Sequence, residues 1–324
     1  MLDALEEAGV AALGAIPASI EEFWTTLPLA DGWSSKTKVV RPKAAASAGK
    51  GAKHPLIVMF YGGGFFCGSP LQVTRPAREF AEQYGAVVVC PTYRHTHQVQ
   101  WPVPMRDGWN ALSYLAKNAE SLFGANLDAA SGGGFVVAGF SAGGTVTAVT
   151  TILDVYGDGG STAGGEPLEN LAKPITGAFV GIPLLLEQEM VPPEYRSLWT
   201  SREDNRYAEG VGTANVENII DSLKVTDFRS PWWSPINTLV SSSAVNRHEG
   251  WLPRIYIQAC QLDPLRDDGI IFEKILANKG FETRIDVFPD DGHAAWTALP
   301  FPTKSKEPTI AESTMAGVAW VLKE

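Results

Sequence analysis

The 324-residue sequence predicts an α/β fold, in which helices cover both faces of a mostly parallel sheet. Two observations carry this prediction. From about Pro55 onward, short apolar runs typical of strands alternate with segments of helical periodicity, such as residues 107–119. The chain is also long enough to bury a large core. Six runs are predicted to be strands: residues 56–60, 86–90, 135–138, 175–182, 254–260 and 283–288.

The most informative segment is Gly-Phe-Ser-Ala-Gly-Gly at residues 139–144, between a predicted strand and a helix-compatible segment. A Gly-x-Ser-x-Gly in this position is typical of a nucleophile elbow. Side chains in place of Gly139 and Gly143 would collide with the backbone of such a turn, and the first N–H groups of the helix remain unpaired beside the serine. Ser141 is therefore the predicted nucleophile. An ordinary glycine-rich turn is the alternative for the pentapeptide alone, so the companion motifs decide.

A second glycine-rich segment supplies the first companion. Residues 61–66 read Tyr-Gly-Gly-Gly-Phe-Phe and follow the predicted strand 56–60 directly. Three consecutive glycines let backbone N–H groups converge on one point, as an oxyanion hole requires. The aromatic residues on both sides argue against a flexible linker.

Three carboxylates follow the predicted strand 254–260 and compete for the role of the acid. Asp263 is nearest to the strand end, where active-site groups of open α/β sheets emerge. Asp267 and Asp268 precede Gly269 and a helical pattern, as acids at a helix start do. Asp263 is the preferred candidate, and Asp267 remains the alternative.

His293 is the predicted base, because it lies in a short loop after the predicted strand 283–288 and completes the chain order serine, acid, histidine. The spacing of His95 and His97 suggests a metal pair, but no third ligand cluster of recognisable spacing accompanies them, so no metal site is predicted. The other histidines lie upstream of the serine or in a polar connection: His54, His95, His97 and His248.

In this order the motifs resemble the hormone-sensitive-lipase-like branch (bacterial family IV) of the α/β-hydrolase superfamily, from about residue 55 to the C-terminus. Further matching segments are Pro-Thr-Tyr-Arg at 91–94, Trp-Pro-Val-Pro at 101–104 before Asp107, Asp-Pro-Leu-Arg-Asp-Asp-Gly at 263–269, and Gly-His at 292–293. The resemblance implies a carboxylesterase with an α/β-hydrolase fold and a helical cap.

The resemblance also implies roles for individual residues. It makes Ser141 the nucleophile, Asp263 the orienting acid and His293 the general base. It assigns the oxyanion hole to three backbone N–H groups, those of Gly63, Gly64 and Ala142. One departure is Tyr61, because the family loop begins with a histidine that braces the loop; a tyrosine hydroxyl can brace it with a different reach.

Two segments do not follow the alternation and define the predicted domain organisation. Residues 1–49 are interpreted as an N-terminal cap segment and connector, and 184–249 as a cap insertion, around a catalytic core of 50–183 and 250–324. Long insertions are usually functional lids, and in the resembling family these two pieces cap the active site. Peripheral packing is the alternative.

Aromatic residues near the motifs and in the insertion predict an apolar or aromatic substrate pocket, although each of them is also a good core residue. These candidates are Phe65, Phe66, Phe140, Trp232, Trp233 and Trp296.

Composition narrows the class of partner. The formal net charge of −10, without a long basic run, argues against nucleic acid or an anionic membrane as partner. No apolar run reaches the roughly 18 residues of a membrane span. An acidic N-terminus without a secretory signal and three scattered cysteines indicate a cytoplasmic protein.

The predicted function is a serine esterase that cleaves small to medium, fairly apolar or aromatic esters through an acyl-enzyme. It needs no cofactor, and a homodimer is a possible assembly. A lactonase, dehydratase or cyclase of specialised metabolism on the same scaffold is the alternative. A non-catalytic ligand receptor is disfavoured, because receptors on this frame lack the histidine that His293 supplies here.

Overall fold

The computed structural model describes residues 2–47, 53–160, 168–241, 244–301 and 303–323. In these residues one eight-stranded sheet has the order β1-β2-β4-β3-β5-β6-β7-β8. All neighbours from β4 to β8 are parallel, whereas β1 and β2 are antiparallel. This arrangement confirms the predicted mostly parallel α/β fold. The strands are β1 (Ile20–Pro28), β2 (Ser34–Pro42), β3 (Leu56–Phe60), β4 (Val87–Pro91), β5 (Phe135–Phe140), β6 (Gly177–Gly181), β7 (Arg254–Cys260) and β8 (Thr283–Phe288).

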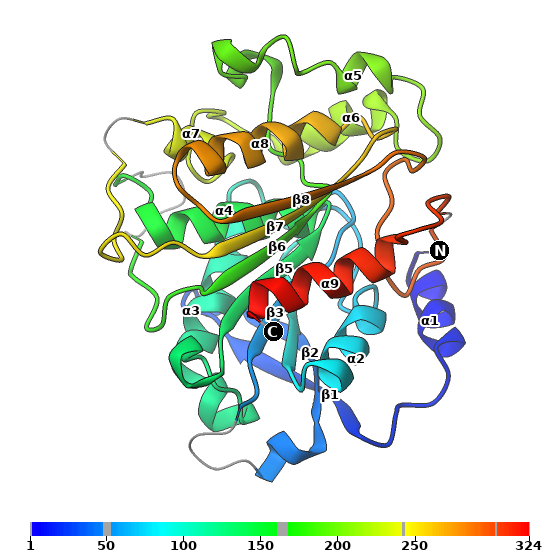
Figure 1. The fold of residues 1–324 in the computed structure, drawn as a ribbon, viewed down its shortest axis with the longest axis vertical. Helices are drawn as coiled ribbons and strands as arrows, with labels where there is room; N and C mark the ends of the chain where they lie inside the picture. The colour runs from blue at the N-terminus through cyan, green and yellow to red at the C-terminus, as the bar shows by residue number, and fades with distance from the viewer. Residues whose placement is uncertain (1, 48–52, 161–167, 242–243, 302, 324) are drawn as a thin grey trace.

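Helices cover both faces of the sheet (Figure 1). Helices α3, α4 and α8 pack on one face, and α2 and α9 on the other. The central strands are buried on both sides, which explains why they read as unbroken apolar runs. The helices are α1 (Leu2–Ala12), α2 (Thr74–Gln83), α3 (Val103–Phe123), α4 (Ala142–Tyr156), α5 (Ser201–Asp204), α6 (Thr213–Leu223), α7 (Pro235–Leu239), α8 (Arg266–Asn278) and α9 (Ile310–Leu322).

The first two strands correct the predicted N-terminal cap segment. Residues 20–42, assigned to residues 1–49 of that segment, form β1 and β2 at one edge of the sheet. The sequence pattern did not predict these strands because charged residues occupy buried positions in them. Lys38 and Glu22 form a buried ion pair with 2.9 Å between Nζ and Oε2. Of this segment, α1 lies beside the substrate cavity described below. Residues 48 and 49, at the end of this segment, lie outside the described residues.

The strand register brings the sequence motifs together at one edge of the sheet. Phe60 at the end of β3 pairs with Gly139 of β5, and Phe140 pairs with Gly181 of β6. Cys260 at the end of β7 pairs with Phe288 of β8. The loops after these parallel strands therefore open at the same end of the molecule, where ligands of α/β sheets bind.

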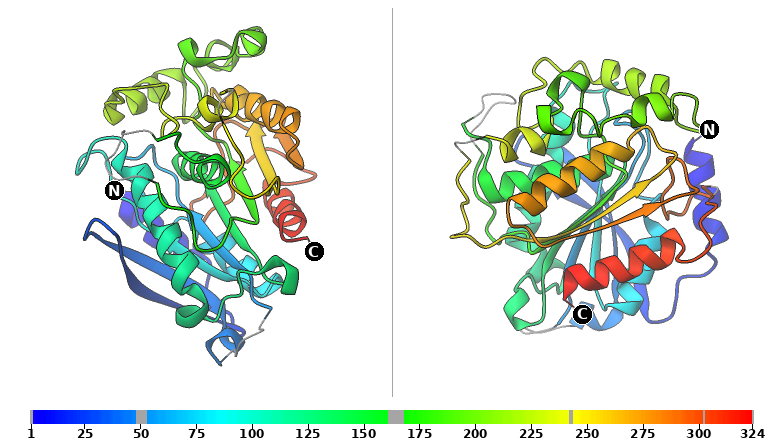
Figure 2. Two further views of the ribbon diagram at one scale, coloured as in Figure 1. Left: turned by 90° about the vertical axis from the view of Figure 1, so that its left-hand side faces the viewer. Right: turned by 45° about the horizontal axis from the view of Figure 1, so that its top comes forward.

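The insertion 184–249 divides into two parts. Helices α5 and α6 lie beyond the carboxyl ends of the strands (Figures 1 and 2). Helix α7 instead packs against α4 and α8, and the preceding Trp232 and Trp233 are fully buried in the core. The second part of the predicted cap insertion is therefore a layer of the core.

Among the described residues, no helix has both the length and the apolar character that crossing a bilayer demands.

Candidate active site

Ser141 occupies the sharp turn between β5 and α4. Its backbone angles, φ 54° and ψ −121°, are strained for a residue with a side chain. A Cβ on Gly139 would lie 2.3 Å from the carbonyl oxygen of Gly143, and one on Gly143 would lie 2.2 Å from that of Phe60. Any side chain at either position would push the turn apart, so both glycines of the motif are sterically required.

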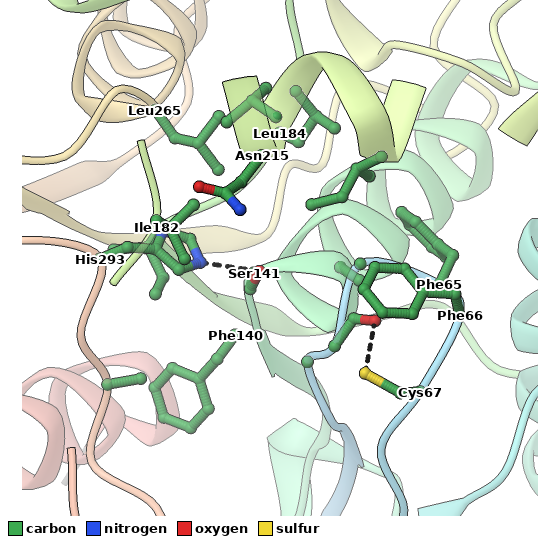
Figure 3. Close-up of a pocket in the computed structure, with 18 of the residues that line it drawn as sticks. Phe65, Phe66, Cys67, Phe140, Ser141, Ile182, Leu184, Asn215, Leu265 and His293 are labelled. Atoms are coloured by element: carbon green, nitrogen blue, oxygen red, sulfur yellow. Dashed lines mark hydrogen bonds between the residues drawn. The ribbon is translucent and has the colours of Figure 1, made fainter. Parts of the chain in front are cut away.

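The structure brings the three predicted side chains into one hydrogen-bonded row. Nε2 of His293 is 2.9 Å from Oγ of Ser141 (Figure 3), and its Nδ1 is 2.8 Å from Oδ2 of Asp263. Asp263 is fully buried, and its other oxygen accepts the Leu265 N–H at 2.8 Å. The carboxylate is thus held from both sides and fixes the plane of the imidazole.

The alternative acid, Asp267, is placed elsewhere. Its Oδ2 accepts the N–H groups of Thr200 and Ser201 at 2.7 and 2.6 Å, at the start of α5. The neighbouring Asp268 is buried and accepts the N–H groups of Leu185 and Leu186 at 2.8 and 3.0 Å. Burial raises the pKa of Asp268 above its usual value. These two carboxylates anchor the insertion to α8.

The glycine loop (residues 61–66) lies beside Ser141. Gly63 and Gly64 have φ of 117° and 60°, and a Cβ on Gly63 would lie 2.2 Å from the Cys67 carbonyl oxygen. The Gly63 carbonyl accepts N–H groups of Phe66 and Cys67 at 3.2 Å each. Within the described chain, the N–H groups of Gly63, Gly64 and Ala142 have no hydrogen-bond acceptor. All three residues line the same cavity as Ser141, so these donors are available to a ligand.

Tyr61, the departure from the family motif, is buried behind the glycine loop. Its ring stacks on Tyr93 with 4.5 Å between centroids, and its hydroxyl lies 3.1 Å from Nε2 of His95. The Tyr93 hydroxyl in turn donates to the Tyr61 carbonyl at 3.0 Å. Burial raises the pKa of Tyr61 and lowers that of His95. A tyrosine and a histidine together therefore brace the loop from the side opposite the cavity.

A cavity of about 530 Å³ opens above Ser141. Its wall is mostly apolar and comes from the glycine loop, the elbow, the segment after β6, helix α6, the loop after His293 and Leu2 of α1. Of the six aromatic candidates, Phe65, Phe66 and Phe140 line it.

The three tryptophans do not line the cavity, and the prediction for them is wrong. Trp232 and Trp233 are 0% and 1% exposed, and Trp233 packs edge-on against Phe228 with 5.2 Å between ring centroids. Trp296 packs edge-on against Phe80 at 6.4 Å. Trp232 and Trp233 are buried in the core, and Trp296 is half-buried against it.

Several cavity residues belong to no motif by which the sequence alone could identify them. Asn215 and Ile219 reach the cavity from α6, and Leu2 from α1. Ile182 is a further wall residue with φ 42°, an outlier for a β-branched side chain. With Phe65 at φ 64° and Ser141, three strained non-glycine residues surround the cavity, as expected where structure is held for function.

Helix α1 is fixed to the cavity wall by a buried carboxylate. Glu6 is 1% exposed and accepts hydrogen bonds from Oγ of Ser69 and, at 2.8 Å, from Nε2 of the wall residue Gln72. A Cβ on Gly9 would lie 2.4 Å from the Ala298 carbonyl oxygen, so α1 touches the loop after His293 through its bare backbone. Helix α1 thereby borders the cavity, which its Leu2 lines.

Two further kinds of reactive group, a cysteine thiol and a metal site, find no support in the described residues. Cys67 lines the cavity, but its thiol donates to the Gly63 carbonyl at 3.3 Å. Burial, with the negative charges of Glu6 and Asp3, raises its pKa, which keeps the thiol protonated. In the described ranges, no group of three or more acidic, histidine or cysteine side chains is arranged to hold a metal ion.

The strand order and the position of Ser141 after β5 define the class of protein as the α/β hydrolases. Over residues 57–297 the chain matches the family described as alpha/beta hydrolase fold, and it belongs to that family. Within it, the chain falls in the hormone-sensitive-lipase-like branch, as its motifs indicate.

Curated relatives and solved structures agree with this placement. A versiconal hemiacetal acetate esterase of Dothistroma septosporum is 28% identical over 277 residues, covering 85% of this chain and 76% of that protein. Esterase LipI of Mycobacterium tuberculosis is 28% identical over 241 residues, covering 72% and 63% of the two chains.

Among solved structures, vibralactone cyclase has a TM-score of 0.78 at 23% identity, covering 99% of this chain and 85% of the other. An esterase of Rhizomucor miehei has a TM-score of 0.75 at 19% identity, covering 99% and 88%. At these identities the solved structures demonstrate a shared fold.

Proposed function

We propose that this protein is a serine hydrolase that cleaves small to medium, fairly apolar or aromatic carboxylic esters through an acyl-enzyme. The hydrogen-bonded row of Ser141, His293 and Asp263 carries the proposal, because it ends at a cavity that also holds three unpaired N–H groups. Relatives named as esterases in two kingdoms of life support it.

Each side chain of this hydrogen-bonded row has its own role in the proposed reaction. Oγ of Ser141 attacks the ester carbonyl carbon while Nε2 of His293 takes its proton. Asp263 holds the productive tautomer and stabilises the imidazolium. Nε2 then returns the proton to the departing alkoxide, and the alcohol leaves. Water repeats the sequence on the acyl-enzyme and releases the acid.

The N–H groups of Gly63, Gly64 and Ala142 are proposed as the oxyanion hole. They are fixed before substrate binds, so they stabilise the oxyanion of the tetrahedral intermediate without reorganisation. One such donor is typically worth about 10²- to 10³-fold in rate, which makes the geometry of the glycine loop as important as the row of side chains.

The cavity supports the proposed size and polarity of the substrate. Its volume of about 530 Å³ lies within the usual range for small-molecule sites. The wall residues Phe66, Phe140, Leu184 and Leu265 are apolar, and no lysine or arginine is among the described residues that line the cavity. A polyanionic ester would find no counter-charge there.

The test is turnover of p-nitrophenyl esters of increasing acyl length by the wild type and Ser141→Ala. We expect the variant to lose about 10⁴-fold or more in kcat, and covalent labelling by a fluorophosphonate to disappear with it. Ser121→Ala is the matched control, because Ser121 is exposed on α3 and does not line the cavity. Turnover retained by a folded Ser141→Ala would contradict the proposal.

A cyclase, lactonase or dehydratase is the second candidate function, favoured by the fold shared with vibralactone cyclase. In a cyclase, the acyl-enzyme would be attacked by a hydroxyl of the substrate itself instead of water. Product analysis separates the two, since a hydrolase releases a free acid and a cyclase a lactone. A dehydratase would keep its turnover in Ser141→Ala. Ester turnover above background would exclude a receptor without catalysis.

A further inference from the structure

Asn215 brings an oriented amide into the cavity wall. It lies in the first turn of α6, is exposed, and lines the cavity (Figure 3). Its Oδ1 accepts the backbone N–H of Gly212 at 3.0 Å. Because a backbone N–H only donates, this bond identifies the oxygen of the amide and fixes the side chain at the helix start.

The same bond determines what Asn215 presents to a ligand. With Oδ1 held by Gly212, the Nδ2 group is directed into the space between α6 and Ser141 (Figure 3). Nothing in the described part of the chain accepts a hydrogen bond from Nδ2. The neighbouring wall residues Leu184, Leu265 and Ile182 are apolar. Nδ2 is therefore an unpaired, oriented donor in a mostly apolar wall, the arrangement that gives a small-molecule site its polar selectivity.

Other polar groups of α6 do not share this arrangement. Ser222 also lines the cavity, but its hydroxyl donates to the Ile219 carbonyl at 2.7 Å. Asn218 lines the cavity one turn later, and within the described residues its amide has no hydrogen-bond partner that would orient it. Asn215 is the member of this wall whose donor has a defined direction.

We propose that Asn215 determines substrate specificity by donating a hydrogen bond from Nδ2 to a second oxygen of the ester substrate. That oxygen is a hydroxyl, ether or carbonyl oxygen outside the ester group that is cleaved. The substrate class is thus an ester with an apolar skeleton and one further hydrogen-bond acceptor, placed in either the acyl or the alcohol part. This inference rests on the proposed esterase function.

The expected selectivity follows from the strength of one neutral hydrogen bond. An acceptor oxygen that receives Nδ2 should raise kcat/KM about 3- to 10-fold over an isosteric methylene. The oxygen also changes the intrinsic reactivity of the ester. The measured quantity is therefore the ratio of kcat/KM within a matched pair, compared between wild type and variant, in which the intrinsic effect cancels.

Two matched pairs test the two parts of the substrate. For the acyl part, the pair is p-nitrophenyl 3-methoxypropanoate and p-nitrophenyl pentanoate. For the alcohol part, it is 2-methoxyethyl butanoate and butyl butanoate. Asn215→Leu keeps the approximate size and removes the donor. We expect the ether preference of the wild type to fall about 3- to 10-fold in at least one pair, and that pair identifies the part of the substrate that carries the acceptor.

Asn215→Asp separates selectivity from helix capping. A carboxylate retains the acceptor for the Gly212 N–H and favours a helix N-terminus, so the fold is kept. It places a second acceptor where Nδ2 was. If Asn215 acted only as a structural residue, Asp would restore the wild-type ratio; we expect a ratio at or below that of Asn215→Leu.

Glu217→Gln on the same helix is the control, because Glu217 is exposed and does not line the cavity. It should keep the wild-type ratios. Ratios in Asn215→Leu and Asn215→Asp within twofold of wild type for both pairs would overturn this inference while leaving the esterase proposal intact. Absence of Ser141-dependent turnover of every ester would instead overturn the esterase proposal.

Discussion

The hydroxyl of Tyr61 lies 3.1 Å from Nε2 of His95, behind the loop that carries Gly63 and Gly64. The resemblance to the family implies a histidine at the start of this loop, where this chain has Tyr61. Here the imidazole comes instead from the segment after β4, and the tyrosine supplies the hydroxyl that meets it. In this chain Tyr61 and His95 contact each other behind the glycine loop.

The first prediction concerns this brace. Tyr61→Phe keeps the stack on Tyr93 and removes the hydroxyl, so we expect unfolding to cost about 1 kcal/mol less. If the glycine loop supplies the oxyanion donors, kcat should fall on the order of 3- to 10-fold with little change in KM, because those donors act on the transition state. Urea unfolding and steady-state kinetics measure both. Tyr207→Phe, at a residue that is 93% exposed, serves as control, and an unchanged kcat in Tyr61→Phe would show that the brace does not position the donors.

The second prediction separates core aromatics from pocket aromatics. Trp232→Ala and Trp233→Ala each empty a fully buried site, and we expect each to cost about 3–5 kcal/mol in unfolding free energy. The relative rates across acyl lengths should stay as in the wild type. Phe66→Ala should do the reverse, because Phe66 lines the cavity and is 48% exposed. A shift in acyl-length preference in either tryptophan variant would show that the tryptophan contacts the substrate.

The third prediction compares two glycines within helices. Gly143→Ala should abolish folding or distort the elbow, since its Cβ would lie 2.2 Å from the Phe60 carbonyl oxygen. Gly269→Ala meets nothing closer than 3.5 Å and should stabilise the protein by about 0.5–1 kcal/mol, because alanine favours a helix. Thermal unfolding and p-nitrophenyl ester turnover check both. A folded, active Gly143→Ala would refute the steric account of the motif.

The sequence was sufficient for the part of the molecule where chemistry requires a fixed motif. The glycines at 139 and 143 are required by backbone contact, and chain order leads from Ser141 to Asp263 and His293. The buried strands of the parallel sheet were equally visible, because burial on both faces leaves an apolar run.

The remaining features depend on partners that a linear reading does not supply. The strands β1 and β2 carry charges that are neutralised only across the sheet and α2, where Glu22 meets both Lys38 and Arg78. Trp232 and the pocket residue Phe66 are both large apolar side chains in the sequence, and their packing in the structure distinguishes them. Asn215 can be identified as a candidate specificity residue only from the structure, in which the Gly212 N–H orients its amide.

The fourth prediction is that two histidines give stability opposite pH dependences. Burial, with the nearby His97, lowers the pKa of His95 below its usual 6.5. Its contribution to stability is therefore present above about pH 6.5 and is lost as the pH falls through the folded-state pKa. The carboxylate of Asp154, with 3.2 Å between its Oδ2 and Nε2 of His248, raises the pKa of His248. Its contribution is complete below about pH 6.5 and is lost as the pH rises through the folded-state pKa.

Urea unfolding between pH 5 and 9 of the wild type, His95→Gln and His248→Gln tests these signs. The unfolding free energy of the wild type minus that of His95→Gln should rise with pH. The same difference for His248→Gln should fall with pH. Because both side chains are partly accessible to solvent, we expect changes of a few tenths to about 1 kcal/mol. Difference curves that slope the same way for both histidines would contradict the assignment, since burial and a carboxylate partner shift an imidazole in opposite directions.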